Sequence, residues 1–251
     1  MTTTALAATQ PHHLTRPVRR PSTTSQIAGP RPALVTFAAV ALAGAFLTMV
    51  YLHTVSVGEL SPVSTTVSDL IFVEGLGWLF GVSTGLLAVA STALTRALAR
   101  IRLPGAALIT GLLSLWSLGL VTAAAFPTDP IGMDTVSLVG QIHRYAGAMM
   151  YVSLPLAGWL VYLRSRGVPA WAPYRRVVGA LSLSGAVLGG VFTLSHAPKL
   201  FPGSPVADIF DGHLVHGLVE RLLILSLFGL LLTIGIAVAQ VNSVATQRRS
   251  A

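Results

Sequence analysis

The chain has 251 residues, of which 53% are hydrophobic and only 10% are charged. A soluble domain carries roughly a quarter charged residues, so this composition is typical of a membrane protein. The formal net charge of +8 does not indicate nucleic-acid binding, because the arginines form short clusters between apolar segments and no basic stripe carries interleaved aromatics. The absence of cysteine excludes disulfides, thiolate metal sites and cysteine nucleophiles.

Residues 1–31 are rich in Thr, Pro, Ala and Arg and show no periodicity, which predicts a disordered tail. A signal peptide fits poorly, because the first apolar run starts only after this segment and is about 20 residues long. An organellar transit peptide is a second alternative, since the first acidic residue is Glu59 and Arg, Ser and Thr are plentiful before it.

Six apolar stretches follow, each long enough to cross a hydrocarbon core of about 30 Å as a helix. They lie at Ala33–Leu52, Gly75–Leu94, Leu103–Phe126, His143–Leu163, Val177–His196 and Leu214–Ala239. We therefore predict an all-α, polytopic transmembrane helical bundle with six spans over residues 32–240, followed by a C-terminal tail at 241–251.

The charges are segregated along this pattern. Thirteen of the sixteen basic residues precede the first span, follow the last span or lie between spans two and three or four and five. All eight carboxylates and five of the seven histidines lie on the other side. The positive-inside rule then predicts a multi-pass protein of the inner or plasma membrane, with both termini in the cytoplasm.

Gly77, Gly81 and Gly85 recur every four residues in the second span. Small residues at this spacing let helix backbones approach closely, either between two copies of the chain or within one bundle. The pattern therefore offers a homo-oligomer contact, with packing inside one chain as the alternative.

The segment leading into the last span carries His213, His216, Glu220 and Arg221. On a helix, His213, His216 and Glu220 stand at i, i+3 and i+7 and line one face. Two imidazoles three residues apart can share a metal ion, and a carboxylate one turn deeper can ligate or act as a base. The alternative is a structural ion-pair network, because ionisable groups inside a span usually face the bundle interior.

His143 opens the fourth span beside Arg144. If spans four and six pack together, His143 is a third imidazole at the same depth, and Arg144 is a partner for Glu220 or Asp129. Zinc is the metal that these ligands suggest. Haem is disfavoured, because electron carriers of this kind stack histidine pairs through the membrane, whereas the histidines of the spans lie at one end here.

Two further acids lie on the same side. Thr66 and Asp69 have capping-box spacing, so helix capping competes with a hydroxyl–carboxylate pair of Ser68 and Asp69 facing a cavity. Asp129 lies between two prolines, which predicts a rigid turn that holds an exposed acid at the membrane surface.

The order of four short motifs resembles a bacterial and archaeal family of six-span membrane proteins, the domain of unknown function numbered 998. The motifs are Ser64-Thr-Thr-Val-Ser68-Asp69, Phe126-Pro127-Thr-Asp129, Gly140-Gln-Ile-His143 and Glu220-Arg221. The resemblance covers roughly residues 33–240 and implies the six-span fold, but no activity. More distantly, Ser, Asp and His at one membrane face look like the zinc-dependent ceramidase and receptor superfamily of seven-span hydrolases.

The first functional hypothesis is an extracytoplasmic cavity whose polar residues bind or act on a membrane lipid or another amphiphile. If the protein is an enzyme, metal-assisted hydrolysis or transfer is expected. The ligands would be His143, His213 and His216, and the general base Asp69 or Glu220.

The second hypothesis is a non-catalytic structural or assembly protein. In that case the polar residues form a buried ion-pair network that includes Ser68, Asp129, Arg144 and Arg221. A transporter is a further alternative, disfavoured because no acid lies near the bilayer midplane and no internal repeat is visible.

Overall fold

The computed structural model describes residues 32–101, 103–130, 133, 135–196, 203–205, 209 and 215–250. Six helices in this part are long and apolar enough to cross a membrane, which confirms the predicted all-α, six-span architecture. They are α1 (Pro32–Val55), α2 (Trp78–Ala99), α3 (Ala106–Ala125), α4 (Leu138–Arg164), α5 (Ala172–Leu194) and α8 (His216–Ser250). The predicted N-terminal tail lies outside the described residues.

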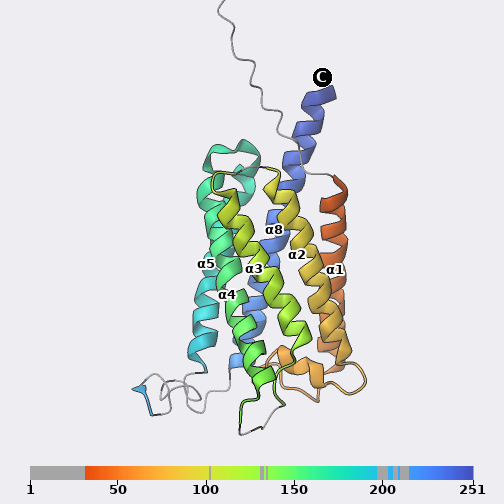
Figure 1. Cartoon of the computed structure of the whole chain (residues 1–251), viewed down its shortest axis with the longest axis vertical. Coiled ribbons are helices and arrows are strands. Elements are labelled where there is room, and N and C mark those ends of the chain that lie inside the picture. The colour runs from red at the N-terminus through yellow and green to blue at the C-terminus, as the bar shows by residue number, and fades with distance from the viewer. Residues whose placement is uncertain are drawn as a thin grey trace, which may run out of the picture.

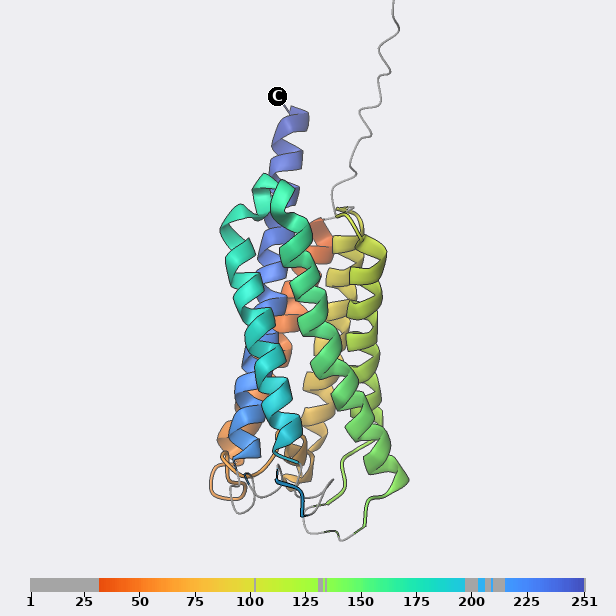
Figure 2. The ribbon, with the colours of Figure 1, turned by 90° about the vertical axis from the view of Figure 1, so that its left-hand side faces the viewer.

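The helices run up and down as neighbours in a ring (Figures 1 and 2). Each packs on the next along the chain, and α8 closes the ring by packing extensively on α5 and more sparsely on α1. Three short 3₁₀ segments accompany them: η1 (Ser68–Phe72) between α1 and α2, and η2 (Ser165–Gly167) and η3 (Pro169–Trp171) between α4 and α5.

The helix ends differ from the predicted spans by several residues, and two of these differences concern helices that carry the site. Helix α4 begins at Leu138 rather than at His143, because Ser137 caps it by accepting a hydrogen bond from the Gly140 N–H. Helix α8 continues to Ser250, through the segment that was expected to be a tail.

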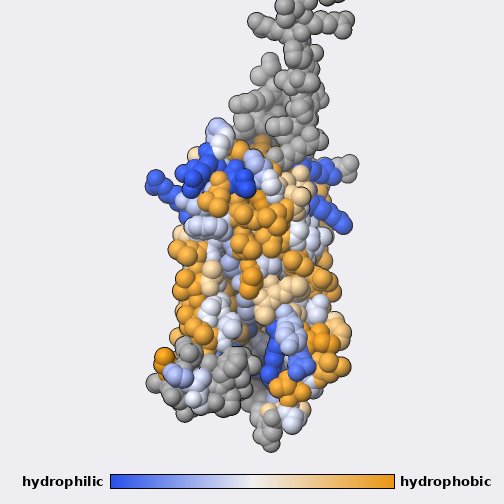
Figure 3. Space-filling view, turned by 60° about the vertical axis from the view of Figure 1, so that its left-hand side comes forward, coloured by the Kyte–Doolittle hydropathy of each residue, from blue (hydrophilic) through white to orange (hydrophobic). Residues whose placement is uncertain are grey.

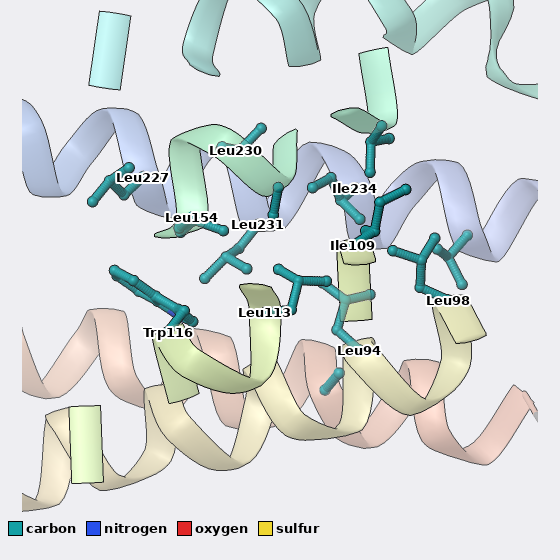
Figure 4. Close-up of a cluster of buried hydrophobic side chains, with 14 of the residues drawn as sticks. Leu94, Leu98, Ile109, Leu113, Trp116, Leu154, Leu227, Leu230, Leu231 and Ile234 are labelled. Carbon is teal, nitrogen blue, oxygen red and sulfur yellow. The ribbon is translucent and has the colours of Figure 1, made fainter. Parts of the chain in front are cut away.

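The core of the bundle is made of aliphatic side chains from α2, α3, α4 and α8 around Trp116 (Figure 4). Helix α8 contributes Leu223, Leu227, Leu230, Leu231 and Ile234, all essentially inaccessible to solvent. Figure 3 shows hydrophobic residues around the middle of the bundle and hydrophilic residues at its upper end, with a second hydrophilic group near the lower end. We call this upper end, where α1 begins and α2 and α4 end, the arginine end, and the opposite end the acidic end.

The three glycines spaced four residues apart at the start of α2 have different surroundings in the structure. A Cβ atom at Gly77 would overlap the Ile71 carbonyl oxygen, so Gly77 is required for packing within the chain. A Cβ atom at Gly81 or Gly85 would have no neighbouring atom within 4 Å. The contact between two copies of the chain stays a prediction, for which Gly81 and Gly85 are not needed inside the bundle.

Candidate functional site: two polar clusters at the acidic end

The side chain of Glu220 lies in the second turn of α8 and is only 5% exposed. Its Oε2 accepts a hydrogen bond of 2.6 Å from the backbone N–H of Val67, in the segment between α1 and η1. Its Oε1 accepts one of 2.7 Å from the hydroxyl of Tyr151 on α4. Both carboxylate oxygens are therefore satisfied by the protein itself, and Glu220 joins three segments that are distant in sequence.

Arg221 also binds the segment between α1 and η1 to α8. Its Nη1 donates to the carbonyls of Thr65, at 2.6 Å, and Gly217, at 3.0 Å. The Leu218 N–H, unpaired within its own helix, donates to the Val63 carbonyl at 2.9 Å. A Cβ atom at Gly217 would overlap the Thr65 carbonyl oxygen, so only glycine permits this approach.

Asp69 completes this arrangement. Its Oδ2 accepts hydrogen bonds from the Thr66 N–H at 2.8 Å and from the Thr66 hydroxyl at 2.6 Å, and the Ser68 hydroxyl lies 3.0 Å from that of Thr66. Asp69 thus reaches back to the residue three positions earlier, as the capping-box spacing predicted, but Thr66 precedes the N-cap of η1, Val67, which no side chain caps. Together these residues form the first polar cluster: Thr65, Thr66, Val67, Ser68, Asp69, Tyr151, Gly217, Glu220 and Arg221.

The second polar cluster joins the end of α3 to the start of α4. The Oδ1 of Asp129 accepts hydrogen bonds from the hydroxyl and the N–H of Ser137, the capping residue of α4. The carboxylate packs against Gly140, where a Cβ atom would overlap Oδ2. Arg144 lies 3.7 Å from the same Oδ2, which settles its partner as Asp129 rather than Glu220.

Asp129 is not the exposed acid that the two flanking prolines suggested. Its side chain is 8% exposed, whereas that of Arg144 is 49% exposed. The turn places the carboxylate inward, against the N-terminus of α4, where the unpaired N–H groups and the helix dipole favour a negative charge. The carboxylate therefore faces the protein, and the rigidity of the turn stays a prediction.

His143 belongs to the second cluster as well. Its Nδ1 lies 2.8 Å from the Phe126 carbonyl oxygen, which closes the turn after α3. Because a carbonyl only accepts, Nδ1 carries the proton of this hydrogen bond.

An aromatic column connects the first cluster to α5. The Tyr151 ring contacts Phe192 edge-on with centroids 5.5 Å apart, and Phe192 contacts His196 in the same manner at 4.8 Å. The His196 ring in turn lies 5.7 Å from that of His216, one turn before Glu220 on α8. The middle of α4 and the acidic ends of α5 and α8 are thus joined by aromatic contacts beside the buried carboxylate.

The predicted metal ligands are brought together only in part. In the described ranges, no three His, Asp or Glu residues group closely enough to hold a metal ion. His143 is bound to Phe126 in the second cluster, and His216 packs on His196. His213 lies outside the described residues, so the three-histidine zinc site stays a prediction.

Several residues of the clusters were not anticipated from the sequence: Tyr151, Ser137, Gly217 and Thr65. The contact of Tyr151 with Glu220 could have been predicted, because a tyrosine hydroxyl within a span needs a hydrogen-bond partner and Glu220 is an acid within a span. Thr65 contributes only its backbone carbonyl, which no residue pattern marks.

The four motifs that carry the family resemblance pair with one another in space. The motif Ser64–Asp69 meets Glu220-Arg221 in the first cluster, and the motif Phe126–Asp129 meets Gly140–His143 in the second. Each motif is therefore one half of a contact that holds a loop at the acidic end onto a helix.

Comparison with known proteins gives a family and no activity. The family model described as "Protein of unknown function (DUF998)" matches residues 37–237, which include all four motifs. No curated protein matches the chain, and no solved structure matches it. Because the match extends over most of the chain, the protein belongs to the DUF998 family.

Proposed function

We propose that this protein is a non-catalytic integral membrane protein that works by binding or assembly. Its acidic-end polar residues hold two loops onto the helix ends. One observation carries the proposal: both oxygens of Glu220 accept hydrogen bonds from within the protein. A general base must reach the proton that it removes, directly or through one water, and here the protein's own donors occupy both positions.

Asp69 supports the same proposal. Two donors of Thr66, three positions earlier in the chain, occupy its Oδ2, so this oxygen is held by its own loop. Of the two candidate catalytic carboxylates, neither offers the unoccupied, cavity-facing pair of oxygens expected of a hydrolytic base. The network interpretation accounts for these contacts without a substrate.

A metal-assisted hydrolase or transferase acting on a lipid is the second candidate. The observation in its favour is the ring contact between His196 and His216, 5.7 Å apart at the centroids, at the end where His213 also lies in the sequence. Two adjacent imidazoles with a third nearby in sequence are ligands of the kind that zinc takes.

Purification in mild detergent, with zinc content and unfolding measured together, separates the two candidates. We expect no stoichiometric zinc, and strong destabilisation by Glu220→Ala and Arg221→Ala, with Glu74→Ala as the control because Glu74 is an exposed loop carboxylate. One zinc per chain that is lost in His216→Ala, together with unchanged stability of Glu220→Ala, would establish the hydrolase instead.

A further inference from the structure

A polar pocket lies between α2 and α3 on the side towards the arginine end. Its volume is about 300 Å³, and it is lined by Thr92, Thr95 and Arg96 of α2 and by Ser114 and Ser117 of α3. All five lining residues are polar, although both helices are membrane spans. Neither polar cluster of the acidic end includes any of them.

The pocket lies within the span. Thr92 is seven residues before the end of α2 at Ala99, and Ser117 is eleven residues after the start of α3 at Ala106. At 1.5 Å per residue, these positions are about 10 Å and about 16 Å from the helix ends. Side chains lean towards the N-terminus of their helix, so Arg96 leans from the boundary towards Thr92. At such depth a Thr or Ser hydroxyl can be satisfied by a carbonyl of its own helix, but a donor without a partner is costly unless a polar ligand or water reaches it.

The hydroxyl groups of the pocket are mostly acceptors. The Thr92, Thr95 and Ser117 hydroxyls donate to the carbonyls of Ala88, Ser91 and Leu113 on their own helices, at 2.8, 2.8 and 3.0 Å. Their protons are therefore used, and what they offer to the pocket is oxygen lone pairs.

The donors of the pocket come from Arg96 and Ser114. Arg96 is exposed, and in the described part of the chain no carboxylate pairs with it. Ser114 is exposed too, and it has no hydrogen-bond partner among the residues that the structure describes. A guanidinium and a hydroxyl side by side are donors suited to a phosphate group.

We propose that this pocket binds the headgroup of an anionic phospholipid from the leaflet at the arginine end. The phosphate accepts from Arg96 and Ser114, and hydroxyl or ammonium donors of the headgroup reach the oxygens of Thr92, Thr95 and Ser117. A phosphatidylglycerol headgroup provides the charge and both kinds of partner. Phosphatidylcholine has the phosphate but no donor, so it fits only half of the pocket. The site is independent of the function proposed for the acidic end.

The test is lipid retention by the full-length protein in detergent, measured by native mass spectrometry with phosphatidylglycerol and phosphatidylcholine in competition. We expect the wild type to prefer phosphatidylglycerol by about tenfold or more. The variant Arg96→Gln should lose this preference. The control Arg176→Gln, an exposed arginine at the same end outside the pocket, should keep it.

The pair Thr92→Val and Ser114→Ala tests the hydroxyl groups with little risk to the fold, because both changes nearly preserve side-chain volume. We expect Thr92→Val to weaken the preference for phosphatidylglycerol severalfold, because Thr92 accepts from the headgroup donors, and Ser114→Ala to weaken retention of both lipids, because Ser114 donates to the phosphate. An equal effect of Arg176→Gln and Arg96→Gln would overturn the proposal, because it would reveal general surface charge. Protection from unfolding by inorganic phosphate as effective as that by phosphatidylglycerol would overturn it in favour of a soluble anion. A change of oligomeric mass in Arg96→Gln would overturn it in favour of a contact between two copies.

Discussion

The hydrogen bond from Tyr151 to Glu220 allows a quantitative test of the first polar cluster. The change Tyr151→Phe removes the hydroxyl that donates to Oε1 at 2.7 Å and leaves a buried carboxylate oxygen without a partner. A hydrogen bond to a charged group contributes roughly 1.5–3 kcal/mol, so the free energy of unfolding should fall by this amount. For a chain of this size, that corresponds to a decrease in Tm of roughly 3–12 °C.

A second substitution measures how much the negative charge of Glu220 contributes to this hydrogen bond. In Glu220→Gln, the amide oxygen still accepts from the Val67 N–H, and the amide nitrogen donates to the Tyr151 hydroxyl, which can accept as well as donate. Tyr151→Phe in the Glu220→Gln background should therefore cost only roughly 0.5–1.5 kcal/mol, the value of a neutral hydrogen bond. The difference between the two backgrounds is the coupling energy of the double-mutant cycle.

The assay is unfolding of the purified protein in detergent, followed by circular dichroism while the denaturing detergent fraction is increased. The matched control is Tyr145→Phe, because Tyr145 lies on the same helix and is 73% exposed. If Tyr151→Phe unfolds like Tyr145→Phe, Glu220 is not held by this contact, and the first cluster does not fasten α4 and α8 to the loop after α1.

Four further predictions concern packing, the second cluster and orientation. Gly217→Ala should destabilise the protein by roughly 1–3 kcal/mol in the same assay, because its Cβ would clash with the Thr65 carbonyl oxygen. Gly81→Ala, with open space around the Cβ position, should be neutral or stabilising, and a loss of dimer on gel filtration would instead reveal an oligomer contact there. Asp129→Ala should cost roughly 1–3 kcal/mol, because the Ser137 donors and the helix N-terminus lose their acceptor; unfolding equal to the wild type would contradict this. A fluorescent protein fused after residue 250 should fold and fluoresce in the cytoplasm, whereas an active periplasmic phosphatase at that position would contradict the predicted orientation.

Hydropathy predicted the six spans because the hydrocarbon core sets both the length and the composition of each helix. It placed the start of α4 too late, because Gln141, His143 and Arg144 lie in the first two turns, which are helical and yet polar. It ended α8 too early for a related reason. Once a helix leaves the apolar region it no longer needs apolar side chains, and the polar residues from Gln240 onward are compatible with helix.

The polar clusters were predictable only at the level of their motifs. Glu220 and Arg221 were identifiable from their cost within a span, but their partners were not. The first partners are backbone groups of Val67 and Thr65, which carry no pattern in the residues. Tyr151 is separated from Glu220 by 69 positions, so the pairing depends on how α4 and α8 pack. Which loop motif contacts which helix motif is decided by how the helices pack, so it could not be predicted from the sequence of the motifs alone.

The charge segregation has different consequences at the two ends of the bundle. At the acidic end, Glu220, Asp69 and Asp129 each accept hydrogen bonds from donors of the protein. The buried Oδ2 of Asp129 has no hydrogen-bond partner among the described residues and lies 3.7 Å from the Arg144 guanidinium. At the arginine end, none of the arginines that the structure describes lies within ion-pair distance of a carboxylate of the chain. Their counter-ions must come from the solvent or from lipid, and a basic residue near an anionic membrane surface gains about 1 kcal/mol. The carboxylates of the acidic end are thus paired mainly with groups of the protein. The described arginines of the opposite end have no carboxylate partner and can bind an anionic ligand. Arg96 differs from the other arginines there because it borders a pocket of hydroxyl groups, and we therefore expect lipid selectivity to depend on it rather than on the charge of that end as a whole.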